Sequence, residues 1–176
     1  MSTQITTGKV RLSYAHLFEA VAIQEGQPKK YSTAILIPKT DKATIKAINA
    51  AVEAAKEKDK GKWGGKIPAA SLLKTPLRDG DEEKPDDENY AGMYFLNASS
   101  TKMPKVVDRN KQEILDPDEV YSGCYARVVL NFYGFNVQSK GVAAGLQAVQ
   151  KLEDGDNLGG GSVNIDEAFG DDGDDL

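Results

Sequence analysis

The chain has 176 residues, with 22 Lys and Arg against 27 Asp and Glu, one cysteine and one histidine. No apolar run approaches the roughly 20 residues that span a bilayer, one cysteine cannot form an intrachain disulfide, and one histidine lacks partners for a zinc site or a catalytic triad. We therefore expect a cytoplasmic protein that has no metal or other cofactor and is not an enzyme.

Charge is distributed unevenly along the chain. Residues 153–176 carry nine carboxylates and no Lys or Arg, so residues 1–152 keep 18 acidic against 22 basic side chains, a net charge of +4. This contrast predicts one basic domain over 1–152 and a disordered acidic tail over 153–176. A tethered polyanion beside a basic domain suits a protein that must exclude weak anionic competitors from a nucleic-acid groove.

Apolar residues among the tail's carboxylates favour a docking peptide over a segment that only keeps the protein soluble. The residues predicted to bind a protein partner are Phe169, Asp171, Asp172, Asp174, Asp175 and Leu176.

The first half of the domain predicts two strands and one helix. Lys9 to Tyr14 alternates, with Lys9, Arg11 and Ser13 on one face and Val10, Leu12 and Tyr14 on the other, and Tyr31 to Ile37 is rich in β-formers. A helix is expected from Asp41, with Thr40 or Asp41 as its cap, to Lys58 or Lys60. Its lysine-rich end, 56–62, either complements the helix C-terminus or contacts phosphates; both remain open.

The second half predicts mostly strands. An irregular excursion over 61–89 precedes a short strand at 93–99, a hairpin pairs 104–107 with 112–115, and the longest strand runs from Tyr121 to Phe135. The last element, 141–152, fits a strand or a helix by pattern alone. Cys124 lies in an apolar pattern and is expected to be a buried, inert thiol.

The strand over 121–135 has two different faces. Its even positions are apolar or small, whereas its odd positions carry aromatic rings and Arg127. Aromatic rings interleaved with an arginine suit a protein that binds single-stranded nucleic acid. Every nucleobase can stack on a ring, and every nucleotide carries a phosphate that the arginine can neutralise. The alternative is that these tyrosines cover a half-buried second layer. The expected stacking residues are Tyr121, Tyr125, Tyr133 and Phe135, and the expected phosphate contacts are Lys9, Arg11, Lys102, Lys105, Arg109 and Arg127.

About five strands, one helix between strands and long loops predict a mainly β fold, specifically the Greek-key oligonucleotide-binding (OB) barrel. Several segments also resemble a phage family of single-stranded DNA-binding proteins with this barrel, first catalogued without a function. They are GKVRLSYAHLFEA, YSTAILIPK, VYSGCYARVVLNFYGFN with its SGCYARV motif, and KGVAAGLQAVQKLEDGD.

The resemblance implies that 141–151 is a barrel strand. It also implies that the protein coats single-stranded DNA during phage replication and recombination in the host cytoplasm, and that the tail contacts replication partners and competes with DNA. A homodimer is a further expectation.

One alternative is a phage protein-interaction or structural module that binds no nucleic acid. A weaker one is a magnesium-dependent hydrolase or nuclease using the carboxylates of 79–88, which lie in a loop with no strand to fix their geometry.

Overall fold

The computed structural model describes residues 2–22 and 25–158. The strands are β1 (Gln4–Thr6), β2 (Val10–Val21), β3 (Lys30–Pro38), β4 (Leu73–Lys74), β5 (Arg78–Asp79), β6 (Met93–Ser100), β7 (Lys105–Val107), β8 (Tyr125–Val137) and β9 (Ser139–Glu153). The helices are α1 (Lys42–Lys58) and α2 (Gly80–Glu83), with short 3₁₀ turns η1 (Lys60–Trp63), η2 (Glu88–Tyr90) and η3 (Pro117–Glu119). In the described ranges, no helix has the length and apolar character needed to cross a membrane.

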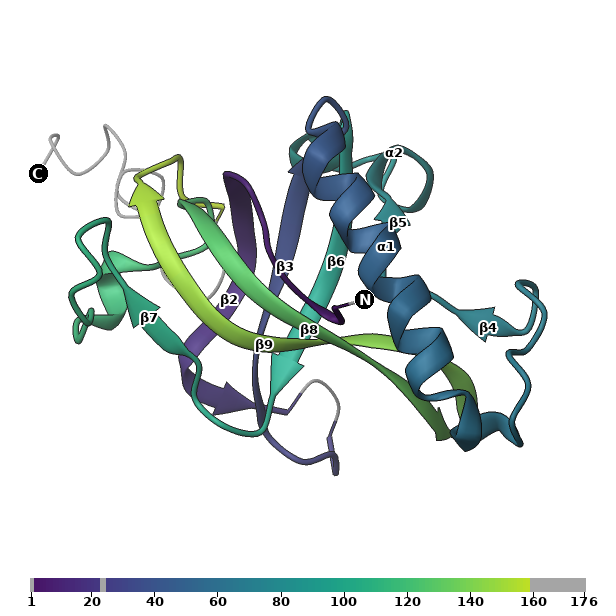
Figure 1. Ribbon diagram of the computed structural model, residues 1–176. Coiled ribbons are helices and arrows are strands. Elements are labelled where there is room, and N and C mark those ends of the chain that lie inside the picture. The colour runs from purple at the N-terminus through teal and green to yellow at the C-terminus, as the bar shows by residue number, and fades with distance from the viewer. Residues whose placement is uncertain (1, 23–24, 159–176) are drawn as a thin grey trace, which may run out of the picture.

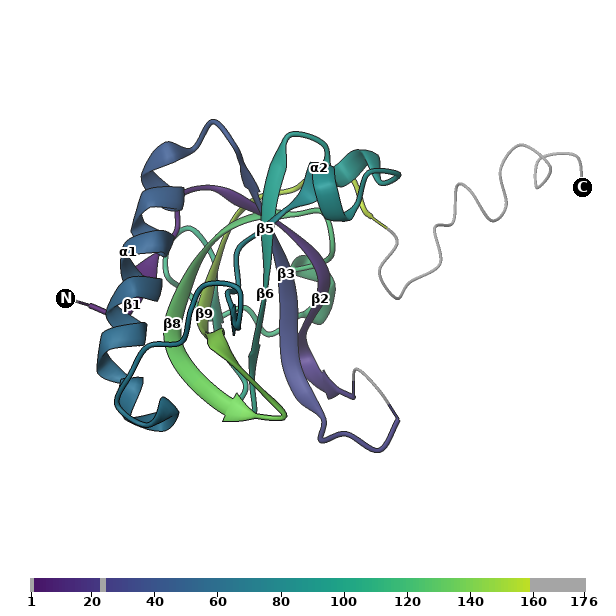
Figure 2. The same cartoon turned by 90° about the vertical axis from the view of Figure 1, so that its right-hand side faces the viewer.

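Five strands close into a barrel (Figures 1 and 2). Their order is β8-β2-β3-β6-β9, and antiparallel pairing of β8 with β9 completes the circuit, while β6 and β9 run parallel. The barrel interior is filled by large apolar side chains such as Leu12, Ile35, Leu96 and Phe132, all nearly inaccessible to solvent. This order and closure are those of the OB barrel, so the predicted fold class is confirmed.

Helix α1 packs its apolar stripe against the barrel, along one side of the molecule in Figure 2. Ile48, Ala51, Val52 and Ala55 are buried at three- and four-residue spacing, and the carboxylate of Asp41 accepts a hydrogen bond from the Thr44 amide at the N-terminus. The predicted helix, its cap and its C-terminal end are therefore confirmed.

Strands β8 and β9 form the long curved hairpin that dominates Figure 1. In β8 the even positions from Ala126 to Gly134 are all buried and the odd positions are not, which confirms the predicted alternation. The segment from 141 to 152 lies within β9, as the family resemblance implied. Cys124 is fully buried, and this burial raises the pKa of its thiol. The prediction that the strand begins at Tyr121 was wrong: residues 121–124 form a turn, and β8 begins at Tyr125.

The structure also confirms most of what was predicted for the hairpin after β6 and for the excursion over 61–89. Val107 bridges Glu113, and the Ile114 amide donates to the Val106 carbonyl, so the hairpin after β6 is confirmed. The excursion over 61–89 is mostly exposed, although it buries Trp63, Leu73 and Gly80. Just beyond it, Tyr90 packs edge-on against Phe95, with ring centroids 5.1 Å apart, and thereby covers part of the outer face of the sheet.

Strand β2 departs from the predicted alternation at its middle. Tyr14 was expected to share the core face with Val10 and Leu12, but its side chain is 58% exposed and its φ is +48°. The pairing with β3 shifts register between Ser13 and His16, so an irregularity turns Tyr14 outward. Ser13 pairs with Ala34, on the face that carries Arg11, but it is buried rather than exposed.

Candidate nucleic-acid interface

Three of the predicted residues meet on the outer face of the barrel, where β2 and β8 begin. Arg11 pairs with Tyr125 across the β2–β8 ladder. The Lys9 Nζ lies 4.9 Å from the centre of the Tyr125 ring, and the Arg11 guanidinium carbon lies 5.5 Å from it. Both distances are within the range of cation–π attraction, so the two cations are held beside the ring. We call Lys9, Arg11 and Tyr125 the proximal cluster.

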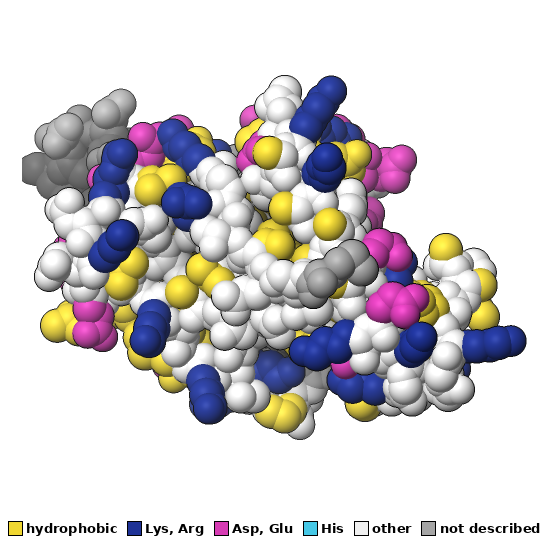
Figure 3. Space-filling view, viewed as in Figure 1, with side chains coloured by type: hydrophobic (Ala, Val, Ile, Leu, Met, Phe, Trp, Pro, Cys, Tyr) yellow, Lys and Arg dark blue, Asp and Glu magenta, His cyan; other side chains and the backbone are white. Residues whose placement is uncertain are grey.

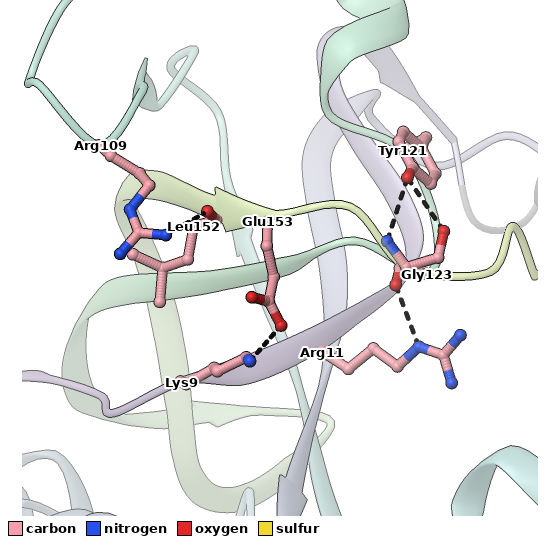
Figure 4. A network of polar contacts seen from close by, with 8 residues as sticks. Lys9, Arg11, Arg109, Tyr121, Gly123, Leu152 and Glu153 are labelled. Atoms are coloured by element: carbon pink, nitrogen blue, oxygen red, sulfur yellow. Dashed lines mark hydrogen bonds and ion pairs between the residues drawn. The ribbon is translucent and has the colours of Figure 1, made fainter.

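The three predicted arginines are anchored by backbone carbonyls. Arg11 donates to the carbonyls of Gly123 (3.0 Å) and Asp156 (2.8 Å), Arg127 donates to that of Thr7 (3.1 Å), and Arg109 donates to that of Leu152 (3.3 Å). A guanidinium has five N–H donors, so these bonds fix each side chain while leaving other donors for a phosphate. Figure 4 shows Arg11 and Arg109 at the two sides of this region.

Tyr121 is placed differently from the other predicted aromatic residues. Because β8 starts after it, Tyr121 does not belong to the odd-numbered face of the strand. Its hydroxyl lies 3.0 Å from an Asp154 carboxylate oxygen and 2.9 Å from the Gly155 carbonyl, and it accepts from the Gly155 amide at 3.1 Å. Burial raises the pKa of this hydroxyl. Tyr121 therefore anchors the segment that follows β9.

That segment is the start of the acidic run, and it lies against the proximal cluster. Glu153 forms an ion pair with Lys9, and Asp154 pairs with Lys151 at 2.7 Å, which lowers the pKa of the Asp154 carboxyl. Gly155 lies so close to the Tyr125 ring that an added Cβ would come within 2.8 Å of it. Beyond these contacts the Leu158 amide donates to the Ser122 carbonyl. The predicted tail residues from Phe169 to Leu176 lie outside the described part of the chain.

The basic hairpin extends the outer face beside β9. Lys105 pairs with Ala148, which pairs with Val129, so these three residues form one row across β7, β9 and β8. Arg127 and Gln150 form the next row. Lys105 is exposed and shares this face with Arg127, whereas Lys102 is exposed in the loop between β6 and β7.

Tyr133 and Phe135 lie at the other end of β8. They face Ala143 and Gly141 of β9, whose small side chains leave room for the rings. Eight residues separate Tyr125 from Tyr133, which corresponds to roughly 26 Å along a strand. The predicted residues therefore divide into a proximal group and a distal group, which the alternation of one strand had placed on a single face.

A groove that the sequence did not predict lies on the outer face of β2, β3 and β6. It has a volume of about 430 Å³, and its lining includes Tyr14, Ser32, Ala34, Asn97 and Ser99. Ser32 pairs with Ser99 and Ala34 with Asn97, so small side chains form its floor, and Tyr14 contributes to its wall. Oligonucleotides bind OB barrels across the second and third strands, which here are β3 and β6. In the sequence, the small residues Ser32 and Ala34 alternate with the larger Tyr31, Thr33 and Ile35, and this pattern could have indicated the groove.

The sequence model of the family described as "Enterobacter phage Enc34, ssDNA-binding protein" matches residues 3–176. The chain belongs to this family.

One relative with a similar sequence is protein p50 of Acyrthosiphon pisum secondary endosymbiont phage 1. It is 37% identical over 176 residues, covering 96% of this chain and 93% of the relative. The solved single-stranded DNA-binding protein from bacteriophage Enc34, in complex with ssDNA, has a TM-score of 0.78 at 29% identity, covering 89% of this chain and 90% of that one. Its C-terminal truncation gives a TM-score of 0.76 at 30% identity, covering 89% of each chain.

A more distant structure shares the fold. The single-stranded DNA-binding protein gp2.5 of bacteriophage T7 has a TM-score of 0.62 at 15% identity, covering 95% of this chain and 93% of that one. At this identity the likeness supports the OB architecture alone.

Proposed function

We propose that this member of the Enc34 family is a non-enzymatic single-stranded DNA-binding protein that coats DNA during phage replication and recombination in the host cytoplasm. The observation that carries the proposal is the Tyr125 ring that lies beside Lys9 and Arg11 on the outer face of the OB barrel. A ring beside two cations offers one base a stacking surface and its phosphates two charges, without reading sequence.

The proximal cluster and the groove lie on the same outer face of the sheet, with the buried cluster of Leu36, Tyr90 and Phe95 between them. Arg11 and Ser13 lie on one face of β2, next to Leu36 and Ala34 of β3, and Ala34 lines the groove. A strand that stacks on Tyr125 would pass over this apolar cluster to enter the groove beside Tyr14. The Lys105 and Arg127 side chains lie on the opposite side of Tyr125, along β8 and β7, where they would attract the phosphates of the same strand.

We also propose that the acidic run regulates this surface. Glu153 already neutralises Lys9, and the backbone of Gly155 and Asp156 lies on Tyr125 and Arg11, so DNA must displace these contacts to reach the cluster. The tail residues Phe169, Asp171, Asp172, Asp174, Asp175 and Leu176 would contact replication or recombination proteins. The homodimer remains a prediction.

Fluorescence anisotropy of a labelled oligo-dT at low and moderate salt tests the proposal, using the full chain and chains ending at Leu158 or at Leu152. We expect tight, salt-sensitive binding that strengthens with each truncation, because the first removes the distant carboxylates and the second also removes Glu153, Asp154 and Asp156. If none of the three chains binds, the proposed function is wrong. Binding that is unchanged by truncation would remove the regulatory role alone.

Tyr125→Ala tests the site, with Tyr94→Ala as its matched control. Tyr94 also has a cation over its ring, Lys39 at 5.2 Å, but it pairs with Ile37, on the core-facing side of the sheet. Loss of one stacked base costs about 1–3 kcal/mol, so Tyr125→Ala should weaken binding by about 5-fold or more. Equal losses in the two variants would show that Tyr125 has no particular role. Magnesium-dependent cleavage of the oligonucleotide would revive the nuclease alternative.

A further inference from the structure

The end of the molecule opposite the proximal cluster is rich in lysine. Residues 56–74 contain six lysines and two carboxylates, and Lys140 of β9 lies beside them because it pairs with Leu73 of β4. In Figure 3, Lys and Arg side chains gather at the lower right, where α1 ends and the β8–β9 hairpin turns. No residue of this end other than Tyr133 and Phe135 belongs to the interface described above.

The carboxylates here are already engaged. Lys60 pairs with Glu57 at 3.3 Å and Lys62 with Asp59 at 3.9 Å, and on the helix Lys56 pairs with Glu53 at 2.8 Å. Within the described ranges, the ammonium groups of Lys58, Lys66, Lys74 and Lys140 have no ion-pair or hydrogen-bond partner, and all four side chains are exposed. This end therefore carries surplus positive charge.

The segment that carries Lys60 and Lys62 is bonded firmly to β8. The Trp63 indole donates to the Phe135 carbonyl at 2.9 Å, Lys62 donates to the Gly134 carbonyl at 2.8 Å, and the Gly134 amide donates to Asp59 at 2.7 Å. These bonds join η1 to β8 on the face opposite the side chains of Tyr133 and Phe135. A charge held in this way loses less conformational entropy when it binds a ligand.

Phe135 and Lys74 lie in one row of the sheet. Phe135 pairs with Gly141 on β9, and Gly141 pairs with Lys74 on β4. A Cβ on Gly141 would lie 2.7 Å from the Phe135 ring and 2.6 Å from the Lys74 carbonyl, so glycine lets the ring and the lysine-bearing strand approach each other. Phe135 and the strand that carries the unpaired Lys74 therefore lie side by side, which places an aromatic ring and a positive charge at the same end of the sheet.

We infer that this end is a second contact surface for the same single-stranded nucleic acid, formed by Tyr133, Phe135, Lys58, Lys66, Lys74 and Lys140. The inference rests on the proposed function and extends the bound strand along β8 beyond Arg127. Attraction to the C-terminus of α1 accounts for Lys56 and Lys58, which lie in its last turn, but it does not account for Lys74 and Lys140, which lie on strands.

The only tryptophan, Trp63, reports on this surface because its indole bonds the Phe135 carbonyl. A first titration compares Trp63 fluorescence with a short oligo-dT of about 4 nucleotides and a long one of about 16, the two ends of the range of OB site sizes. We expect the long oligomer to change the emission and the short one to bind with a smaller change, because it is held at the proximal cluster.

The decisive variant carries Lys58→Gln, Lys74→Gln and Lys140→Gln. Its control carries Lys42→Gln, Lys46→Gln and Lys84→Gln, which remove the same charge from exposed positions elsewhere. Each lost phosphate contact lowers the slope of log affinity against log salt by about 0.7, so we expect a decrease of about 2 for the long oligomer and little change for the short one.

The outcomes separate the two proposals. If the wild-type chain binds neither oligomer, the proposed function fails. If it binds both and the two triple variants behave alike, the proposed function stands and the second surface is wrong. A loss confined to duplex DNA would also overturn the inference, because the surface would then serve a different ligand from the coated strand.

Discussion

Strands β2 and β8 are neighbours in the barrel, yet alternation describes only one of them. β8 pairs with β9 along almost its whole length; its two register shifts, before Ala126 and before Leu130, place the extra residue on β9, and the even side chains of β8 stay in the core. β2 pairs with β8 only at Val10 and Arg11, and its pairing with β3 is interrupted twice. A strand whose own residues all continue the alternation keeps its two faces, whereas an irregularity within a strand, as between Ser13 and His16, can turn a side chain outward.

The largest difference in stability should be seen between alanine substitutions of two adjacent residues that lie on opposite faces of β8. Phe132→Ala leaves a cavity in the barrel and should reduce the free energy of unfolding by about 3–5 kcal/mol. Tyr133→Ala, on the half-exposed face, should reduce it by about 1 kcal/mol or less. Chemical denaturation measures both. Similar losses would mean that Tyr133 is a core residue and that the two-face description of β8 is wrong.

A smaller effect is expected where β8 and β9 meet β4. Gly141→Ala places a Cβ against the Lys74 carbonyl and the Phe135 ring, and should destabilise the fold by about 1–3 kcal/mol. Gly61→Ala is the control, because a Cβ there meets no atom within 4 Å. If the two variants have equal melting temperatures, the distal end is not tightly packed.

The irregularity in β2 can be tested through Tyr14. Glycine adopts its positive φ without cost, so Tyr14→Gly should be more stable than Tyr14→Ala by about 1 kcal/mol. Both variants should bind oligo-dT less tightly than the wild-type chain if the ring borders the path of the strand. Greater stability of the alanine variant would show that the residue leaves the left-handed region in solution.

The smallest effect concerns the turn that sets the start of β8. Lys151, and then Tyr121, hold the pKa of Asp154 below its ordinary value of 3.8. A lowered pKa stabilises the fold above the ordinary value, and this contribution disappears as the pH falls through the lowered pKa. Asp154→Asn should therefore melt slightly below the wild-type chain near neutral pH, and the two melting curves should converge in acid. A constant difference at every pH would argue against the ion pair.

The candidate site shows how far one strand's pattern can be used. The pattern placed Tyr125, Arg127, Tyr133 and Phe135 correctly on one face, because alternation is a local property of the backbone. It could not show that Tyr125 lies beside Lys9 and Arg11 whereas Tyr133 and Phe135 lie far from them, because Lys9 and Arg11 come from another part of the chain. It also extended the strand to Tyr121, because the turn at residues 121–124 depends on Leu12 and Gly155, which contact it from distant parts of the chain.

The sequence by itself determined the long helix, the barrel class, the buried and exposed faces of β8 and the contrast between a basic domain and an acidic run. Each of these follows from local periodicity or from composition. Only the tertiary structure decided that Tyr14 points outward, that Ser32 and Asn97 border one groove, and that Glu153 covers Lys9. Those relations join residues separated by tens to more than a hundred positions, and their geometry is fixed by strand register and packing, which no local pattern encodes.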